Sequence, residues 1–384
     1  MPYDFNKLTD RRNTNSMKWD VSDGELPMWV ADMDFETAPE ITAAIKRKAD
    51  LGIFGYTIVP DAWYEAIIRW WEQRHGFTMK KDWLMFCTGV VPAISSIVRK
   101  LTTVAENVLV MTPVYNIFFN SIVNNGRNVL ESRMKLDGTA YTIDFEDLEA
   151  KLANPQTTLM LLCNPHNPIG KIWDRATLAR IGELCHKHHV VVVSDEIHCD
   201  LTKPGCDYVP FASVSELCAK NSVTCLAPTK TFNLAGLQTA AVMVPDETLR
   251  HKVNRGLNTD EVAEPNVFAV EAAVAAFNHG GGWLDALREY LWQNRQLAEA
   301  FVARELPQVK AIPAEATYLL WLDCRQRIES STDFCRFMRS HSGLYVSDGN
   351  EYRNGEGFLR VNLACPRVRL EDGLARLKKS LEAY

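Results

Sequence analysis

The sequence predicts an α/β fold with a large, mostly parallel central sheet and a smaller α+β domain. Short apolar runs alternate with helical patterns between about residues 84 and 244, which is typical of parallel strands joined by helical crossovers. Beyond about residue 284 the pattern changes to a long helix followed by mixed strands and helices. The chain has 384 residues, of which 47% are hydrophobic, so it is long enough to bury more than one core.

Six apolar runs predict the strands of the large domain, and their composition suits a sheet that is covered on both faces. A helix from Asp174 to about His189 carries Leu178, Ile181 and Cys185 at helical spacing, so one of its faces is expected to pack on that sheet as a crossover. The six runs comprise residues 84–87, 108–111, 159–163, 190–194, 223–227 and 237–244.

The smaller domain is predicted from the two ends of the chain. Near the amino terminus a helix opens at Pro39, where proline suits the first helical turn, and closes near Gly52. Three glycines at 280–282 are expected to break the chain before a long helical pattern that continues through Leu306. Further on, we expect a strand over 316–322, a helix over 332–341, a strand over 358–363 and a helix from about residue 370.

These elements divide the chain into three predicted parts. Residues 1–47 form an amino-terminal arm and part of the small domain, residues 48–283 form the large domain, and residues 284–384 complete the small domain. We find neither an internal repeat nor a low-complexity linker, so the domains are expected to pack closely with the functional site between them.

The charge and hydropathy of the chain argue against several kinds of partner. A formal net charge of -6 and the lack of a basic run give no attraction to nucleic acid or to anionic lipid. The amino terminus has no apolar core of signal-peptide length, and no later segment reaches the apolar length of a membrane span. We therefore expect no nucleic-acid or membrane partner and a cytoplasmic location.

The ten cysteines do not resemble a disulfide scaffold or a metal site. No Cys-x-x-Cys pair occurs, and Cys163 and Cys225 lie in apolar runs, where a free cysteine serves as a small hydrophobic residue. His186, His188 and His189 are close enough in sequence to suggest a metal, but they close a predicted helix, where such side chains suit the carbonyl end. We expect no metal.

Polar residues that follow three of the predicted strands indicate a pyridoxal phosphate site. Lys230 lies in the segment 227–233 after one strand, Asp195 directly ends another, and Asn167 lies in the loop after a third. A lysine amine can hold the cofactor as a Schiff base, a carboxylate can keep its pyridine nitrogen protonated, and an amide can hydrogen-bond its phenolic oxygen. Ligands of open α/β sheets gather beyond the carboxyl ends of strands, where all three residues are expected.

Each of these residues also has an ordinary interpretation. An isolated lysine is usually a solvated surface residue, and an aspartate at the end of a strand often caps a loop or helix. The prolines around Asn167 alone predict only a rigid loop. The combination of the three residues, in this order, favours the cofactor site.

Five segments give the chain a wider resemblance. The chain is similar over nearly its whole length to the fold-type I pyridoxal phosphate enzymes of the class I/II aminotransferase superfamily, and within them to the MalY/PatB-type cystathionine β-lyases, or C-S lyases. The resemblance implies the fold-type I transferase architecture, with its large and small domains. The matching segments are residues 29–35 (WVADMDF), 55–57 (GYT), 195–198 (DEIH), 229–238 (TKTFNLAGLQ) and 359–362 (LRVN).

The resemblance implies further cofactor contacts. Tyr115 matches the aromatic residue that stacks on the pyridine ring, although a tyrosine at the start of a helix is more often simply packed. Thr88 to Val91 stand between a strand and a helix, so the amides of Val90 and Val91 suit a phosphate group. Thr229 adds a hydroxyl for that phosphate.

Two other matches concern the substrate and a second subunit. Arg360 matches the arginine that grips the α-carboxylate of amino-acid substrates, for which a planar guanidinium is well suited, and its ordinary interpretation is a surface strand arginine. Tyr56 matches a tyrosine that reaches the phosphate from the neighbouring subunit. This match implies a homodimer with shared active sites.

Two departures from the aminotransferase pattern favour the lyase branch. His198 stands where aminotransferases usually have a tyrosine, and Gln238 stands where they have an arginine that clamps phosphate. Both changes resemble the MalY/PatB branch. His198 is retained as a cofactor-binding candidate, but what replaces the tyrosine's hydrogen bond and the arginine's charge stays open.

The implied activity is carbon–sulfur β-elimination from cystathionine or a cysteine-type substrate, giving a thiol, pyruvate and ammonia, with Lys230, Asp195 and Tyr56 as catalytic residues. An aminotransferase shares the early steps and is the alternative enzyme. A regulatory protein-binding role is the alternative from another class. Trp29 and Phe35 are expected either to border the substrate pocket or to form ordinary domain-interface core.

Overall fold

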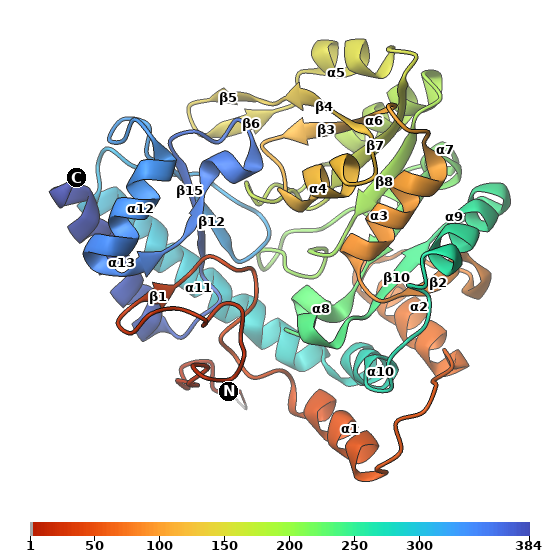
Figure 1. Ribbon diagram of the computed structural model, residues 1–384, viewed down its shortest axis with the longest axis horizontal. Helices are drawn as coiled ribbons and strands as arrows, with labels where there is room; N and C mark the ends of the chain where they lie inside the picture. Colours follow the sequence, from red (N-terminus) through yellow and green to blue (C-terminus); the bar gives the residue numbers. More distant parts are fainter. Residues whose placement is uncertain (1–2) are drawn as a thin grey trace.

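The computed structural model describes residues 3–384, and its two larger sheets differ in character (Figure 1). The large domain is built on a seven-stranded sheet in the order β2-β10-β9-β8-β7-β3-β4. The strands from β9 to β4 run parallel to their neighbours, and only β10 is antiparallel to both of the strands that it pairs with. The predicted, mostly parallel α/β sheet is confirmed. Its strands are β2 (Leu84–Cys87), β3 (Asn107–Thr112), β4 (Asn128–Arg133), β7 (Thr157–Cys163), β8 (Val191–Asp195), β9 (Ser222–Leu226) and β10 (Ala240–Met243).

Both faces of this sheet are buried, as the apolar runs require. Along β3, Val108 and Val110 join the core on one face while Leu109 and Met111 join the core on the other, because successive strand side chains alternate. The first core includes residues of α3 (Val90–Leu101), α4 (Ile117–Val123) and α9 (Glu247–Thr259), and the second includes residues of α5 (Phe145–Leu152), α6 (Arg175–Lys187) and α7 (Glu216–Lys220). The predicted crossover helix is α6, with Asp174 as its amino-terminal cap.

A third core lies at the β2–β10 edge of the sheet. It joins α1 (Pro39–Asp50), α2 (Asp61–His75) and α10 (Ala269–His279), and the short helix α8 (Pro228–Thr231) lies beside it. The hairpin of β5 (Lys135–Asp137) and β6 (Ala140–Thr142) lies beyond the opposite edge, next to β4 (Figure 1). The 3₁₀ turns of the chain are Lys81–Trp83, Phe211–Ser213, Ala235–Leu237 and Gly349–Tyr352.

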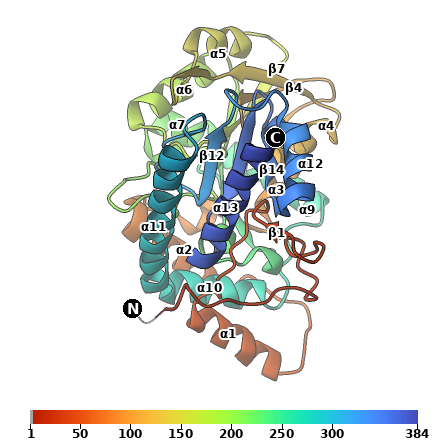
Figure 2. The same cartoon turned by 90° about the vertical axis from the view of Figure 1, so that its left-hand side faces the viewer.

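The small domain combines the last quarter of the chain with the amino-terminal arm. Its antiparallel sheet has the order β11-β12-β15-β14, and β1 (Leu26–Pro27) of the arm pairs in parallel with β13 (Leu344–Tyr345). Figure 2 shows α11 and α13 side by side against this domain. The other elements are β11 (Lys310–Ala311), β12 (Leu319–Asp323), β14 (Ser347–Asp348), β15 (Phe358–Asn362), α11 (Gly281–Glu305), α12 (Ser331–Ser342) and α13 (Arg367–Ala383).

The break at the glycines is shorter than predicted, and the start of one predicted strand is wrong. Helix α10 ends at His279 and α11 begins at Gly281, so the break expected at 280–282 is confined to Gly280. A side chain at Gly280 would meet the Phe232 ring at 2.3 Å, so glycine serves close packing there. The strand expected from residue 237 begins only at Ala240, since Gln238 adopts a left-handed conformation with φ of 52°.

The predicted boundary between the large and small domains falls within the first turn of α11. This helix runs without interruption from the end of α10 into the small domain (Figure 1). The division at residues 47, 283 and 284 therefore stays a prediction. Across residues 3–384, none of the helices combines the length and apolar character needed to span a bilayer.

Candidate active site

Most of the predicted site residues meet in one cavity at the carboxyl ends of the parallel strands. The cavity has a volume of about 260 Å³ and lies where β3, β7, β8 and β9 end. These strands bring together residues that are far apart in sequence. The predicted residues that line it are Val90, Val91, Tyr115, Asn167, Asp195, His198, Thr229 and Lys230.

Lys230 is presented by the short turn that follows β9. Pro228 occupies the first turn of α8, where its fixed backbone angle suits a helix start, and two residues later Lys230 faces the cavity. The ammonium group of Lys230 donates to the carbonyl oxygen of Ala31 at 2.6 Å. Burial and the nearby positive charge of Arg360 lower the pKa of Lys230 to about 8. The interpretation as a solvated surface lysine is therefore wrong.

Asp195 ends β8 and its side chain is buried, with 4% of the residue exposed. One carboxylate oxygen accepts the backbone N–H of Ile197 at 3.1 Å, so the ordinary role in the local turn is also present. Burial raises the pKa of Asp195 to about 7. A buried carboxyl group with a pKa near 7 would readily lose its proton, and so become charged, beside a cationic ring nitrogen.

Asn167 and Tyr115 border the same cavity from the ends of β7 and β3. The guanidinium of Arg360 donates to the Asn167 side-chain carbonyl at 3.4 Å, which leaves the amide NH₂ of Asn167 to donate elsewhere. Burial raises the pKa of Tyr115 to about 12, so its phenol stays neutral. Tyr115 also packs edge-on against Phe118, with ring centroids 5.7 Å apart.

The first turn of α3 offers an anion site at one end of the cavity. Helix α3 begins at Val90, and the N–H groups of Val90 and Val91 have no partner within the helix. The amide of Thr88 is not available, because it donates to the carbonyl of Val262 at 2.9 Å. Thr229 lies on the same cavity and is 8% exposed.

Arg360 projects from β15 of the small domain toward the site and is 5% exposed, so its interpretation as a surface arginine is wrong. Its guanidinium donates to the carbonyl of Trp29 at 2.8 Å and to the Ser347 hydroxyl at 3.3 Å. The Arg360 Nε atom is buried and has no hydrogen-bond partner. A guanidinium held in this way keeps capacity to bind an incoming carboxylate.

His198 lies deep in the cavity wall. Burial, with Lys230 and Arg360 nearby, lowers the pKa of His198 to about 3, so the ring is neutral. Its Nδ1 atom is buried without a partner, and the ring packs edge-on against Tyr318. The Tyr318 hydroxyl donates to the Ala31 carbonyl at 2.9 Å, the same oxygen that Lys230 contacts.

Three contributors were missed by the sequence prediction. Tyr318 has no local signal, because only the fold brings β12 beside the arm. The Ala31 carbonyl belongs to the segment 29–35, which we expected to border the site. Because every residue has a backbone carbonyl, the sequence does not show which one accepts a hydrogen bond there. Thr239, whose buried hydroxyl has no partner, follows the noted Gln238 and also lines the cavity.

Tyr56 is the predicted residue that the fold of one chain does not bring to the site. It is fully exposed and lies outside the residues that line the cavity. The same segment also exposes Leu51, Ile53, Phe54 and Ile58. Its match to a neighbouring-subunit tyrosine thus stays a prediction.

Comparison with known proteins places this geometry in a family. The model of the family "Aminotransferase class I and II" matches residues 26–377. The chain is 44% identical to cystathionine beta-lyase PatB of Bacillus subtilis, covering 98% of this chain and 99% of that protein. It is 31% identical to protein MalY of Escherichia coli, covering 99% of each.

A solved structure agrees with the sequence relatives. Cystalysin from Treponema denticola, whose crystal structure contains a pyridoxal 5'-phosphate cofactor, superposes with a TM-score of 0.96 at 31% identity and complete coverage of both chains. The family model, the full-length relatives and the solved structure agree with one another. The chain thus belongs to the aminotransferase class I and II family and to its MalY/PatB-type C-S lyase branch.

Proposed function

We propose that this chain is a pyridoxal phosphate-dependent carbon–sulfur β-lyase that cleaves cystathionine or a related cysteine-type substrate. The arrangement of three side chains carries the proposal: Lys230 and Asp195 line one cavity, and Arg360 donates to Asn167 in its wall. They supply an amine, a buried carboxyl and a carboxylate receptor. The full-length similarity to PatB, which is named a cystathionine beta-lyase, favours elimination over amino-group transfer.

The groups around the cavity fit the cofactor. Buried polar atoms without partners at His198, Thr239 and Arg360 indicate that the site is built for a polar ligand. Lys230 would hold the cofactor covalently, while Asp195 would face its ring nitrogen. The other residues assigned to it are Asn167 at the phenolic oxygen, Tyr115 at the ring face, and Val90, Val91 and Thr229 at the phosphate.

When bound, pyridoxal phosphate supplies an electron sink for the electron pair that is left at the substrate's α-carbon. Arg360 binds the substrate carboxylate and fixes the direction in which the α-C–H bond points. Once the substrate's amino group has replaced Lys230 on the cofactor, the freed Lys230 would remove the α-proton as a neutral amine, which its lowered pKa of about 8 favours near neutral pH. The Ala31 carbonyl, 2.6 Å from Lys230 Nζ, is placed to receive the resulting ammonium group.

The products follow from the balance of bonds. The carbon–sulfur bond breaks and its electron pair leaves with sulfur, which takes up a proton to become a thiol. Water then hydrolyses the remaining enamine to pyruvate and ammonia. Cystathionine would give homocysteine, and cysteine would give sulfide.

We also propose that the active form is a homodimer. The exposed apolar side chains of the segment 51–58 form a surface that a monomer would leave in water, with Ile53 78% and Ile58 79% exposed. Tyr56, at the centre of this segment, would then reach the phosphate of the partner's site. The site would be incomplete without a second copy.

A cytoplasmic location is proposed as well. All ten cysteines are free thiols, which is the state that a reducing compartment maintains. Cell fractionation tests this proposal, and recovery of the protein outside the cytoplasmic fraction would contradict it.

Substitution of Lys230 tests the proposed activity. Lys230→Ala should lose the visible absorption of lysine-bound cofactor and nearly all release of thiol and pyruvate from cystathionine, because no other group supplies the amine. Lys171→Ala is the matched control, since Lys171 lines a different cavity. Equal turnover by wild type and Lys230→Ala would refute the assignment, and keto acid formed only with an added amino-group acceptor would indicate an aminotransferase.

A further inference from the structure

The helix that carries Lys230 cannot define its own orientation. Helix α8 has four residues, and a helix of this length is not stable by itself in water. Its position must therefore come from contacts with the rest of the protein. One of these contacts is made by the neighbouring residue, Thr231, which is completely buried.

Thr231 is tied to a carboxylate from another element. Its hydroxyl donates to Asp200 Oδ2 at 2.9 Å. Asp200 lies in the loop after β8, five residues beyond Asp195, and is 6% exposed. The bond therefore connects the turn that carries the lysine with the loop that follows the pyridine-facing aspartate.

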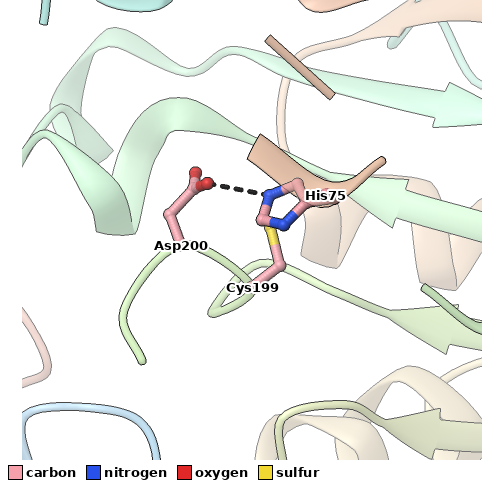
Figure 3. Close-up of side chains that lie close together, drawn as sticks. All are labelled: His75, Cys199 and Asp200. Atoms are coloured by element: carbon pink, nitrogen blue, oxygen red, sulfur yellow. Dashed lines mark hydrogen bonds and ion pairs between the residues drawn. The ribbon is translucent and has the colours of Figure 1, made fainter. Parts of the chain in front are cut away.

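The Asp200 carboxylate is itself fixed from the other side. Its Oδ1 atom accepts from the indole N–H of Trp70 at 2.9 Å. The same atom lies 2.9 Å from Nε2 of His75 (Figure 3), and both partners belong to α2. Although burial opposes ionisation, the contacts with His75, Trp70 and Thr231 keep the pKa of Asp200 below its usual value. The carboxylate thus stays ionised and is held by three partners.

This cluster does not require a metal ion. Potential ligand atoms of His75, Cys199 and Asp200 lie within 4.8 Å of one another. However, both oxygens of Asp200 and Nε2 of His75 already have partners, and none of these atoms is left unsatisfied. Burial beside carboxylates raises the pKa of the Cys199 thiol well above its usual value, which disfavours the thiolate that a metal needs.

We propose that Asp200 is a positioning residue for the catalytic lysine, acting through Thr231. Trp70 and His75 fix the carboxylate, the carboxylate fixes Thr231, and Thr231 sets the direction from which Lys230 approaches the α-carbon. The inference rests on the proposed role of Lys230. A small error in the placement of a reacting group lowers the rate strongly while leaving substrate binding nearly unchanged.

The test compares three variants of the holoenzyme with cystathionine as substrate. Thr231→Val removes the hydroxyl and should lower kcat about 10- to 100-fold, with KM changed less than about two-fold. Thr231→Ser keeps the hydroxyl and should restore most of kcat. Thr157→Val is the control, because Thr157 is also buried and its hydroxyl makes one hydrogen bond, to the Lys151 carbonyl, far from the site along the fold.

A double-mutant cycle assigns the effect to Asp200. If Asp200 acts through Thr231, adding Asp200→Asn to Thr231→Val should lower kcat much less than Asp200→Asn does in the wild type. Should Asp200→Asn fail to fold, the Val and Ser variants still decide the question.

The outcomes separate this inference from the proposed function. An active wild type whose kcat survives Thr231→Val would overturn the positioning role alone, whereas a wild type without lyase activity would overturn the function. A KM rise without a loss of kcat, or equal losses in Thr157→Val and Thr231→Val, would also overturn the positioning role. So would a stoichiometric metal in the purified protein whose removal abolishes activity.

Discussion

The buried carboxyl group of Asp195 affects the stability of the protein, and the same group is proposed to face the ring nitrogen of the cofactor. In the cofactor-free chain its pKa is raised from 3.8 to about 7 by burial. Between these values the folded chain binds a proton that the unfolded chain has released. The free energy of unfolding therefore falls as pH rises through this window. The whole loss of stability from ionising the buried carboxyl is present above about pH 7.

We predict that Asp195→Asn removes this pH dependence. The amide stays neutral and can still accept the Ile197 N–H. Relative to the variant, the cofactor-free wild type should lose stability between pH 5 and pH 7, by at most about 1.4 kcal/mol per pH unit. Urea unfolding of both apoproteins across this range measures the difference, and Glu196, which has a similarly raised pKa, contributes equally to both. Parallel stability curves would contradict the prediction.

Single residues also show how much of the site could be predicted from the sequence. Lys230, Asp195 and Asn167 could be predicted because each follows a recognisable strand, and the carboxyl ends of parallel strands meet. Tyr318 and Asp200 could not, since nothing in their local sequence says that they lie near the lysine. Their positions depend on β12 crossing to the arm and on α2 packing behind α8, which are properties of the tertiary structure.

At the scale of elements, Gly170 shows how the loop after β7 joins the two domains. Its carbonyl accepts the N–H groups of Glu315 and Ala316, and its backbone has φ of +67°. A Cβ atom there would lie 2.5 Å from the Cβ of Ala314 and 2.6 Å from the Ala316 carbonyl oxygen. The loop that carries Asn167 therefore packs directly against the segment before β12.

We predict that Gly170→Ala destabilises the protein by roughly 3–5 kcal/mol, because backbone strain adds to a clash with main-chain atoms. Gly138→Ala is the matched control. Gly138 has φ of +60° but no atom within 4 Å of the added methyl group, so only the strain of about 1–2 kcal/mol applies. Denaturant unfolding of both variants separates the two effects. Equal losses of stability in the two variants would show that the loop moves to relieve the clash, which would contradict the prediction.

The elements that could be predicted are those with a continuous apolar pattern. The six runs correspond to six of the seven strands of the central sheet, since strands buried on both faces must be apolar. The edge strand β4 was missed because its sequence, NVLESR, is largely polar and only partly buried. The short strands β1, β11, β13 and β14 have two residues each, too few to show any periodicity.

At the scale of the whole molecule, the exposed segment 51–58 distinguishes one chain from the proposed assembly. Its side chains belong to no core of the described chain, and Tyr56 is separated from the cavity that it is predicted to serve. If the partner's Tyr56 completes each site, then two inactive variants can repair each other. One variant lacks Lys230 and keeps Tyr56, while the other lacks Tyr56 and keeps Lys230.

We predict that a mixture of Lys230→Ala and Tyr56→Phe chains, unfolded and refolded together, regains activity. A hybrid dimer has one site with Lys230 from one chain and Tyr56 from the other, so random pairing leaves about a quarter of all sites intact. Pyruvate release from cystathionine should rise to about a quarter of the wild-type rate, above the sum of the two variants refolded separately. A mixture of Lys230→Ala with Lys230→Ala/Tyr56→Phe is the control and should stay inactive. If each chain instead supplied both residues to its own site, or if the chain acted as a monomer, no mixture would exceed that sum.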